Sequence, residues 1–391
     1  MKHRIIVLGA GYAGGYAAGQ LARRLHADDV GITVVNAEPD FVERMRLHQL
    51  AAGQDLRRHR LADLFAGTGI HLRPARVTAV DVEHRTVTVT GGEGVDHLGY
   101  DTLLYALGSA AADHGVPGVA EHAHPVADRP SALRLRHRLD ELGEHGAVLV
   151  VGGNLTAIEA ATEIAESRPH LDVTLVTAGE LGGRLGPKAR RHLLRAFDRF
   201  GITVHENTTV DRVEASGATA THRTFTADAV VWAAGFTAHP LAAAAGLEVA
   251  DNGQILVDRM MRSVSHAGVY AAGDSVHVIG DNGRPLPMSC ASAGLTSGQA
   301  VAAIIGDLTG REVPTTSLSY VGNHISLGRR DGIFQAVDGD ARSKTWALRG
   351  RPAARFKAVI LRGAAFGMGH PTFGMPTRRY RVARAAEAAV A

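Results

Sequence analysis

The chain has 391 residues, of which 45% are hydrophobic and 46 are glycine, and its formal net charge is +3. This composition indicates an α/β protein of two or three domains with many tight turns, and the small charge gives no indication of a nucleic-acid partner. The single cysteine, Cys290, excludes an internal disulfide and any CxxC redox pair, which fits a reducing cytoplasm.

The N-terminal region does not predict export or a membrane span. The apolar run at residues 5–8 is too short for the core of a signal peptide, and no run approaches the roughly 20 apolar residues that cross a bilayer. We expect a cytoplasmic protein, with peripheral attachment to the inner face of the cell membrane left open.

The first predicted unit is a strand, a glycine turn, a helix and a second strand. The strand at residues 5–8 ends in Gly9-x-Gly11-x-x-Gly14, an Ala-rich helix follows, and the next strand covers residues 32–35. The first glycine permits the tight turn, the second lets backbone N–H groups approach a pyrophosphate, and the third lets the helix pack on the strand. With the positive end of the helix dipole, this turn predicts a phosphate site.

The residue that binds the ribose hydroxyls is expected at the end of the second strand. Asn36 and Glu38 stand there, and the choice between them is open. An amide lacks the charge of a carboxylate, so Asn36 would bind ribose more weakly per contact.

The middle of the chain repeats this unit. Residues 76–90 alternate apolar and polar side chains around a turn, which indicates a hairpin, and they precede a buried strand at residues 102–108 and a helix at residues 133–142. The strand, turn, helix and strand then recur at residues 148–176, and the hairpin-then-strand order recurs at residues 201–235. The repeat predicts two Rossmann-like domains.

The last part of the chain predicts a return segment and a third, smaller unit. Residues 268–274 read as a strand running into a turn, and residues 291–305 as a helix rich in small side chains. From residue 313 onward we expect two short strands, a helix at residues 355–361 and a basic tail, which together make a small α+β unit.

Four motifs, in this order, resemble those of the two-dinucleotide-binding-domain flavoproteins. They are Gly9-x-Gly11-x-x-Gly14, DTLLYALGS (residues 101–109), VVWAAG (230–235) and GVYAAGD (268–274). The chain is most similar to the type II NADH dehydrogenase-like branch of the FAD-dependent pyridine nucleotide oxidoreductases. The resemblance covers about residues 1–312 and extends only loosely to the C-terminal unit.

The resemblance implies FAD and NADH or NADPH as cofactors. It implies that residues 1–113 and 252–315 bind FAD, that residues 114–251 bind NAD(P)H, and that residues 316–391 are a separate C-terminal unit. In this family the aspartate of the last motif, here Asp274, hydrogen-bonds a ribityl hydroxyl; a helix cap is the alternative role. The residues expected at the cofactors are Gly9, Gly11, Tyr12, Ala13, Gly14, Asn36, Glu38, Ala106, Gly108, Gly152, Asn154, Gly273 and Asp274.

The second glycine turn departs from the family pattern. Only Gly152 remains of three glycines, because Asn154 and Ala157 stand at the other two positions. Alanine is allowed at the third position. Asn154 puts a side chain where backbone should approach the pyrophosphate, although its amide could donate to phosphate and Asn tolerates positive φ. A working and a decayed nicotinamide site both remain open, and the intact frame favours the first.

The ribose-reading position of this second unit is Thr177 rather than an acid. The missing carboxylate argues against a strong preference for NADH. The cations that follow, Arg184, Lys188, Arg190 and Arg191, would suit a 2′-phosphate; a solvated helix face is the alternative.

Glu159 is the candidate catalytic residue. In the family the matching glutamate lies near flavin and nicotinamide, where it is thought to position substrate or relay protons. Its alternative is a carboxylate on the first turn of a helix, which the helix dipole would favour by about 0.3 to 1 kcal/mol.

The helix at residues 291–305 differs from that of quinone-reducing family members, which usually carry an AQ...QQG pattern. Ala291-Ser292 and Thr296-Ser297-Gly298 stand there instead, so a quinone is not assured as the acceptor, and the small hydroxyl residues could make room for a bulkier substrate. Cys290 lacks the partner that disulfide and sulfide reductases use, and we interpret it as a packing residue.

The C-terminal helix reads as amphipathic. Phe356, Val359 and Ile360 share one side, and the flanking and tail cations are Arg355, Lys357, Arg362, Arg378, Arg379, Arg381 and Arg384. The pattern fits docking on an anionic membrane; a helix packed on the FAD domain with a solvated tail is the alternative. No metal site is predicted, because the pairs His122 with His124 and His137 with His145 lack a third ligand.

These patterns predict an FAD-dependent oxidoreductase that passes a hydride from NAD(P)H to flavin and then electrons to a quinone or another small organic acceptor. The alternative is a flavin-dependent oxidase or tailoring enzyme of specialised metabolism with a degenerate nicotinamide site. A non-catalytic FAD-binding sensor is a third class, for which the expected partner domain or second cysteine is missing. A homodimer is left open.

Overall fold

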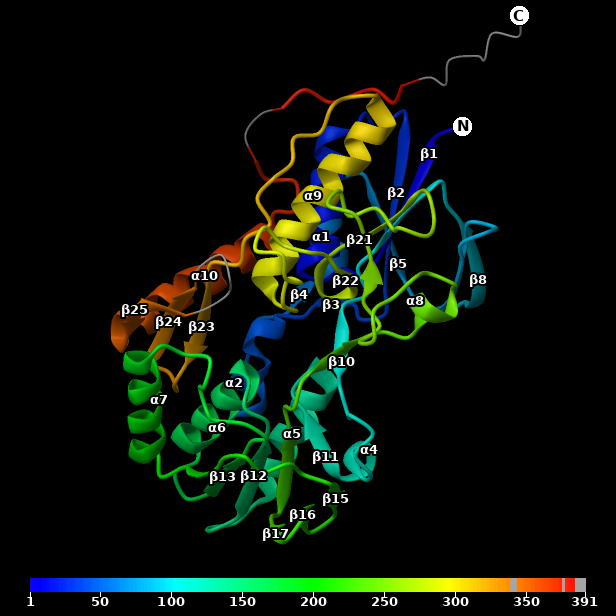
Figure 1. Cartoon of the computed structure of the whole chain (residues 1–391). Helices are drawn as coiled ribbons and strands as arrows, with labels where there is room; N and C mark the ends of the chain where they lie inside the picture. The colour runs from blue at the N-terminus through cyan, green and yellow to red at the C-terminus, as the bar shows by residue number, and fades with distance from the viewer. Residues whose placement is uncertain (338–342, 375–376, 384–391) are drawn as a thin grey trace, which may run out of the picture.

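The computed structural model describes residues 1–337, 343–374 and 377–383, and the two predicted units form two parallel sheets in two lobes (Figure 1). The first sheet has the order β21-β9-β1-β2-β5, with strands β1 (His3–Leu8), β2 (Val30–Asn36), β5 (Ile70–Pro74), β9 (Thr102–Tyr105) and β21 (Val269–Ala271). The second has the order β11-β18-β12-β13-β14, with strands β11 (Ala123–Pro125), β12 (Ala147–Val151), β13 (Asp172–Val176), β14 (Thr203–His205) and β18 (Ala229–Trp232). The α/β class with two Rossmann-like sheets is therefore confirmed.

The two sheets place their glycine turns alike. In the first sheet Leu8, the last residue of β1, pairs with Val35 on one side and with Tyr105 on the other. In the second, Val151 pairs in the same way with Val176 and Trp232. Each turn therefore leaves its sheet at the carboxyl edge, where doubly wound sheets bind ligands.

The strands form because their residues are apolar on both faces. Residues 5–8 of β1 and all of β9 and β18 are buried, as expected for strands covered by helices on both sides. The covering helices are α1 (Tyr12–Arg24), α3 (Leu61–Phe65) and α9 (Cys290–Thr309) on the first lobe, and α5 (Arg129–Glu141), α6 (Leu155–Ser167) and α7 (Pro187–Arg199) on the second.

Antiparallel strands and short elements complete the lobes. The predicted hairpin at residues 76–90 is present and gains a third strand, in the order β6 (Arg76–Asp81), β7 (Thr86–Gly91) and β8 (Gly94–Gly99). The second lobe has β15 (Arg212–Glu214), β16 (Gly217–Ala220) and β17 (Arg223–Thr226), and β10 (Ser109–Ala111) pairs with β19 (Phe236–Ala238) where the chain passes between lobes. The short elements are β3 (Asp40–Phe41), η1 (Arg44–Arg46), α2 (Leu47–Ala51), β4 (His59–Arg60), α4 (Val119–His122), α8 (Leu241–Ala244), β20 (Ile255–Leu256), η2 (Gly273–Ser275) and β22 (Val276–His277).

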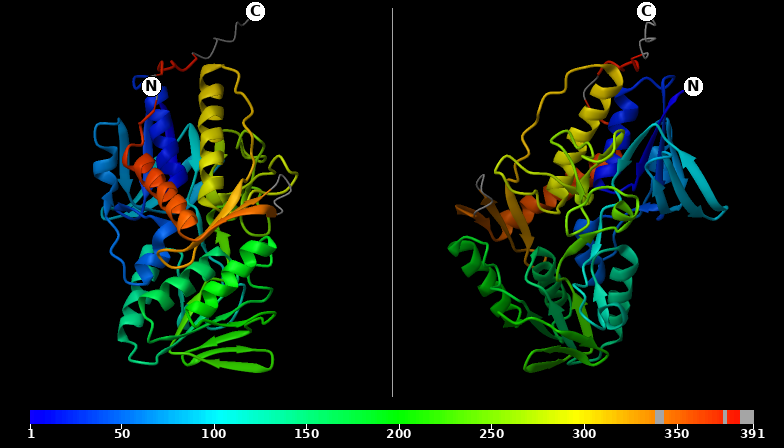
Figure 2. Two further views of the ribbon diagram at one scale, coloured as in Figure 1. Left: turned by 90° about the vertical axis from the view of Figure 1, so that its left-hand side faces the viewer. Right: turned by 45° about the vertical axis from the view of Figure 1, so that its right-hand side comes forward.

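The C-terminal unit has three strands, where two were expected, and a longer helix. Its strands are β23 (Gly322–Ser326), β24 (Gly332–Val337) and β25 (Ser343–Arg349), followed by α10 (Arg351–Gly369). Figure 2 shows this sheet and helix beside both lobes. The tail residue Arg384 lies outside the described residues.

This C-terminal unit contacts both lobes. On the second lobe, the Asp331 carboxylate pairs with His192 at 2.7 Å and with Arg199 at 2.9 Å. On the first lobe, Gln20 of α1 donates to the Pro371 carbonyl at 3.1 Å, and a Cβ added to Gly15 would lie 2.3 Å from the end of the Met368 side chain. Within the described residues, no helix combines the length and apolar character needed to cross a membrane.

Candidate functional site

The first glycine turn has little room at two of its glycines and open space at the third. Gly9 has φ +93°, and a Cβ there would lie 2.4 Å from the Ala106 carbonyl oxygen; a Cβ at Gly14 would lie 2.0 Å from the Gly9 carbonyl oxygen. Nothing lies within 4 Å of a Cβ at Gly11. The outer glycines therefore serve packing, while the space at Gly11, at the start of α1, suits a pyrophosphate.

The two candidate ribose residues differ in availability. Asn36 Oδ1 accepts from the Ala10 backbone N–H at 2.8 Å, and its amide donates to the Glu38 carbonyl at 2.7 Å. Asn36 thus fixes the backbone of the glycine turn with both ends of its amide. The Glu38 carboxylate has no hydrogen bond or ion pair among the described residues, which leaves it as the group that can bind ribose.

Asp274 follows β21 in the short turn η2. Its Oδ2 accepts from Ser109 Oγ at 2.7 Å and lies 3.8 Å from Arg44 Nη1. Gly108 has φ +75°, and a Cβ added there would lie 3.3 Å from Arg44 Nη1. Asp274 does not cap a helix, because the cap of α9 is Ser289; its second oxygen is left for a ligand.

The small residues of α9 support this turn from behind. Thr296 Oγ1 accepts from the Gly273 N–H at 3.0 Å and donates to the Ser292 carbonyl at 2.8 Å, and Ser297 bonds within the helix. Ser292, Thr296 and Ser297 are at most 3% exposed, and a Cβ at Gly273 would touch that of Ala13 at 3.0 Å. These hydroxyl residues therefore do not open a space for a bulky substrate.

Tyr12 and Cys290 lie close to the same edge. The Tyr12 ring packs edge-on against Phe41 at 4.9 Å between centroids, and its buried hydroxyl has no hydrogen-bond partner in the part of the chain that the structure describes. Burial raises the pKa of the Cys290 thiol to about 12, and the nearby Asp274 carboxylate acts in the same direction. Cys290 is therefore a protonated thiol at neutral pH, which suits packing rather than nucleophilic chemistry.

The second glycine turn is built like the first despite Asn154. Gly152 has φ +136°, and a Cβ there would lie 2.2 Å from the Ala233 carbonyl oxygen. Asn154 has φ −82°, and its Oδ1 accepts from the Ala157 N–H at 3.1 Å, so it is the N-cap of α6. The asparagine needs no positive φ and stabilises the helix start.

The ribose position of the second unit offers no free carboxylate. Thr177 is 5% exposed, and its hydroxyl would meet a Cβ at Gly153 at 2.2 Å. Glu206, at the end of the neighbouring strand, accepts from the Leu181 N–H at 2.7 Å and from Arg190 at 3.0 Å. The exposed Arg184, Lys188 and Arg191 side chains have no ion pair among the described residues.

Glu159 lies in a buried cluster of polar groups. It is the fifth residue of α6, beyond the first turn, and is 8% exposed. Its Oε1 accepts from Lys357 Nζ of α10 and from the Ser326 N–H at 2.8 Å, and its Oε2 lies 3.6 Å from His48 Nδ1. Burial acts to raise the pKa of Glu159, but the charges of Lys357 and His48 and the hydrogen bonds from Lys357 and the Ser326 N–H together outweigh it, so the pKa is lowered.

Two neutral imidazoles flank this ion pair. Burial lowers the pKa of His48 and of His324 to about 4, and within the described residues His48 Nε2 and His324 Nδ1 are buried without a hydrogen-bond partner. The His324 ring packs in a tilted arrangement against Phe334 and Phe356, with centroids 4.5 Å and 5.5 Å away. Unpartnered polar atoms beside an aromatic surface are what a site for a flat polar molecule requires.

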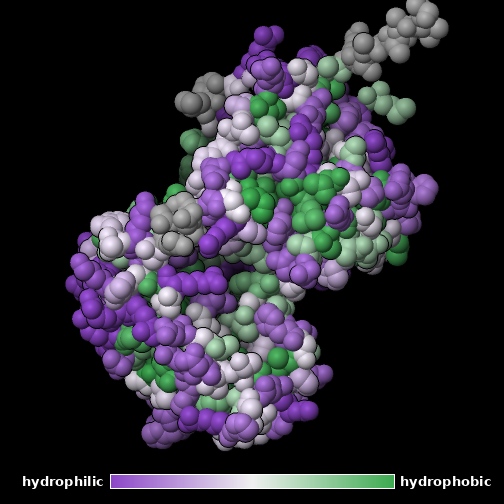
Figure 3. Space-filling model, in the orientation of Figure 1, coloured by the Kyte–Doolittle hydropathy of each residue, from purple (hydrophilic) through white to green (hydrophobic). Residues whose placement is uncertain are grey.

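These groups share one neighbourhood. The charges of Asp274, Arg44, Lys357 and Glu159 all act on the pKa of Cys290, so the edge of the first sheet and the Glu159–Lys357 pair face a common region. Figure 3 shows the surface hollowed between the two lobes.

Sequence reasoning missed three members of this cluster. It treated Lys357 as a flanking surface cation, which is wrong, because Lys357 is 8% exposed and paired. His48 and His324 carried no motif. A single lysine among the apolar residues of an amphipathic helix was the one available signal for Lys357.

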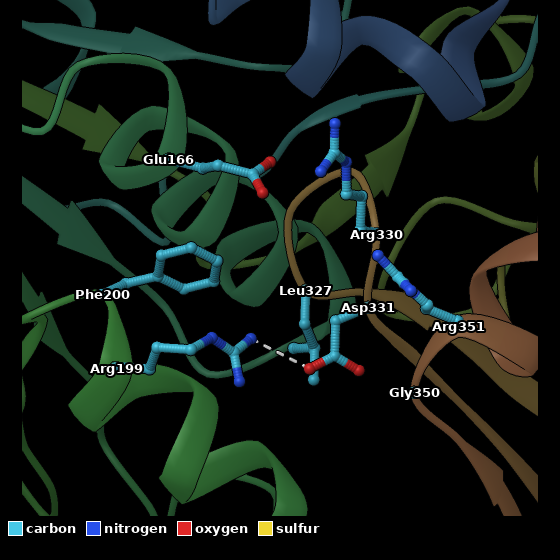
Figure 4. Close-up of a pocket in the computed structure, with 8 residues that line it drawn as sticks. All are labelled: Glu166, Arg199, Phe200, Leu327, Arg330, Asp331, Gly350 and Arg351. Atoms are coloured by element: carbon cyan, nitrogen blue, oxygen red, sulfur yellow. Dashed lines mark hydrogen bonds and ion pairs between the residues drawn. The ribbon is translucent and has the colours of Figure 1, made fainter.

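A separate surface pocket of about 290 Å³ lies between the ends of α6 and α7 and the C-terminal unit (Figure 4). Glu166 and Asp331 point into it beside Arg199, Arg330 and Arg351. Asp331 is paired with Arg199, and neither glycine turn contributes to the lining. The pocket is therefore not the dinucleotide site. Among the described residues, no three His, Cys, Asp or Glu side chains form a group that could hold a metal ion.

Residues 3–295 match the model of the family described as pyridine nucleotide-disulphide oxidoreductase. The chain is 25% identical over 354 residues to demethylphylloquinone reductase NdbB of Synechocystis sp., covering 86% of this chain and 87% of that protein. It is 25% identical over 414 residues to the type II NADH:quinone oxidoreductase of Staphylococcus haemolyticus, covering 94% and 96%. Its fold is similar to that of NDH2 of Plasmodium falciparum in complex with NADH, with a TM-score of 0.78, 15% identity and coverage of 95% and 98%.

Proposed function

Because this chain belongs to the pyridine nucleotide-disulphide oxidoreductase family, we propose that it is an FAD-dependent oxidoreductase that oxidises NADH or NADPH and reduces a quinone or a similar small organic acceptor. The observation that carries the proposal is the buried Glu159–Lys357 pair, which follows the second glycine turn and acts on the pKa of Cys290 together with Asp274. The names of the quinone-reducing relatives support the acceptor class.

We assign residues 1–113 and 252–315 to FAD, residues 114–251 to the nicotinamide cofactor and residues 316–391 to the C-terminal unit. The open space at Gly11 takes the FAD pyrophosphate, Glu38 its ribose and Asp274 a ribityl hydroxyl. FAD, when bound, accepts a hydride and passes two electrons to the acceptor. The start of α6, capped by Asn154, presents its N–H groups to the pyrophosphate of NAD(P)H.

The buried ion pair holds a proton for the acceptor. Reduction of a quinone by NAD(P)H consumes one proton from solvent in addition to the hydride, and yields NAD(P)⁺ and a quinol. The Lys357 ammonium, held in the ion pair with Glu159, is the N–H group that we assign to deliver this proton. His324, Phe334 and Phe356 form an aromatic surface on which a flat acceptor ring can stack.

The competing function is a flavin-dependent oxidase that no longer uses NAD(P)H. The absence of the quinone-type glutamines in α9 favours it, because Thr296 and Ser297 bond within the protein instead. The geometry of Asn154 speaks against it, because the cap takes only the Ala157 N–H and the chain still enters α6 as a regular helix start.

Anaerobic rapid mixing separates the two functions. The flavin absorbance near 450 nm is followed after mixing the purified holoprotein with NADH or NADPH, and then with menadione. Asn154→Asp is the matched variant: it keeps the cap on Ala157 and adds a negative charge where the pyrophosphate binds. We expect bleaching by one or both cofactors, an affinity for that cofactor at least about tenfold weaker in Asn154→Asp, and unchanged FAD content.

If neither cofactor bleaches the flavin at millimolar concentration, the proposal is rejected in favour of the oxidase. Bleaching that is insensitive to Asn154→Asp would reject the assignment of this turn to the nicotinamide cofactor. A flavin that is reduced but not reoxidised by menadione would reject a quinone as the acceptor.

We further propose peripheral membrane contact through α10. Phe356, Val359 and Phe366 are 41%, 63% and 49% exposed on this helix, and Arg355 and Arg362 are exposed beside them. An apolar row beside cations is suited to the surface of an anionic bilayer.

Co-sedimentation with phosphatidylglycerol vesicles tests the membrane contact. We expect binding that decreases with salt and is lost in the double variant Val359→Ser and Phe366→Ser. Val95→Ser, at an equally exposed valine on the first lobe, is the control and should bind like wild type. Equal binding of the α10 variant and the control would remove the proposal.

A further inference from the structure

His48 is a buried histidine that the proposed mechanism does not yet use. It lies on α2, which packs against α5 and α6, and it is 4% exposed. Its Nδ1 is 3.6 Å from Glu159 Oε2, and its Nε2 is buried with no hydrogen-bond partner in the described part of the chain.

The two oxygens of Glu159 have different neighbours. Oε1 receives the Lys357 ammonium and the Ser326 N–H, whereas Oε2 faces His48. A neutral imidazole carries one N–H. With the proton on Nδ1, His48 donates toward the carboxylate, and Nε2 becomes a bare acceptor, which accounts for its lack of a partner.

Burial is the main reason that this imidazole is neutral. Lys357 of α10, Arg329 after β23 and Arg46 of η1 also disfavour a second proton on His48, whereas Glu159 favours one. On the α5 side the charged side chains pair with one another: Arg136 pairs with Asp55 at 2.8 Å, and Arg168 pairs with Asp140 at 2.5 Å.

We propose that His48 is a positioning residue for Glu159: with its proton on Nδ1, it directs that N–H toward Oε2, 3.6 Å away, and favours the ionised carboxylate that pairs with Lys357. The inference rests on the proposed function for its catalytic consequence. Its structural content, the tautomer and the contact with Glu159, can be measured independently.

The kinetic test compares two substitutions. His48→Leu removes the donor, and His48→Asn keeps an N–H near the position of Nδ1. The rate of flavin reoxidation by menadione is measured from pH 5 to 9 after reduction by NAD(P)H. Without the donor, Glu159 protonates at higher pH, so the acidic limb of the profile should move up by about one pH unit in His48→Leu. His48→Asn should retain the wild-type limb, and the remote His124→Leu is the control.

A merely structural role predicts a different result. A rate that falls equally at all pH values in His48→Leu, a wild-type profile in that variant, or an Asn variant that behaves like Leu would each overturn the proposal. Unchanged FAD content is required of both variants, because the proposal assigns His48 to Glu159 and not to the flavin.

Nitrogen NMR of histidine-labelled wild-type holoprotein provides a readout without turnover. The His48 signals, identified by their loss in His48→Asn, should show a neutral ring with the proton on Nδ1 at pH 7. A proton on Nε2 or a charged ring would overturn the proposal even if His48→Leu does not fold. Failure of NAD(P)H or menadione to react would reject the proposed function and leave this readout intact.

Discussion

At the scale of single residues, Glu159 is the group on which the site depends. A carboxylate that is 8% exposed loses its hydration, and the Lys357 ammonium and the Ser326 N–H compensate for much of that loss. The partners come from α10 and β23, so the C-terminal unit supplies the polar environment of a residue on the second lobe.

This pairing predicts strong coupling between Glu159 and Lys357. Lys357→Met leaves a buried unpaired carboxylate and Glu159→Gln a buried unpaired ammonium, so each should reduce the free energy of unfolding by about 3 to 5 kcal/mol. The double variant should recover most of that loss, because it buries no unpaired charge. Denaturant unfolding of the four holoproteins measures the coupling, and purely additive losses would contradict a direct ion pair.

The sequence made Glu159 a candidate but gave no sign of its partners in the structure, and the reason is physical. Glu159 stands at a fixed offset from a glycine turn, which is a local pattern. Lys357 is 198 residues away, and nothing in its helical spacing distinguishes a buried cation from the exposed Arg355 and Arg362. Asn36 was a ribose candidate because of its position at the end of β2. In the structure its amide is occupied by hydrogen bonds to the backbone of Ala10 and Glu38.

At the scale of elements, the end of β13 is where the proposed nicotinamide site would meet the ribose. Thr177 offers no carboxylate there, and Glu206 is held by Arg190 and the Leu181 N–H. A carboxylate at this position binds both ribose hydroxyls and repels a 2′-phosphate.

Thr177→Asp should therefore shift the preference toward NADH. We expect the ratio of kcat/KM for NADH to that for NADPH to rise at least about tenfold, equivalent to about 1.4 kcal/mol. The affinities of NAD⁺ and NADP⁺ should change in the same sense. Thr209→Asp adds the same charge on an exposed neighbour and is the control; an equal shift there would indicate a general effect of charge.

The elements that sequence patterns predicted are those with buried apolar runs, such as β1, β9, β12 and β18. The strand β25 was missed because its residues are mostly exposed or half-buried and polar, so its place is set by pairing with β24 rather than by its own composition. The helix α10 begins four residues earlier than expected, with Pro352 in its first turn, where a missing N–H costs nothing.

At the scale of the whole molecule, the C-terminal unit joins the lobes. It pairs with α7 through Asp331 and packs on α1 through Met368 and Pro371. The His48 and Glu159 cluster lies where α2, α6, α10 and β23 meet, so its protonation state should be linked to the stability of the entire fold.

This linkage predicts loss of stability in mild acid. The folded pKa of His48 is depressed to about 4 from 6.5, so the unfolded chain takes up a proton that the folded state refuses. The stabilising contribution of neutral His48 is complete above pH 6.5 and is lost as the pH falls toward 4. This loss reaches roughly 3 kcal/mol. The melting temperature of the wild-type holoprotein should therefore fall across this window. The melting temperature of His48→Asn should fall less steeply with pH, because this variant lacks the one proton that the unfolded wild-type chain takes up at His48. Parallel curves for the two proteins would show that His48 is already charged in the folded state.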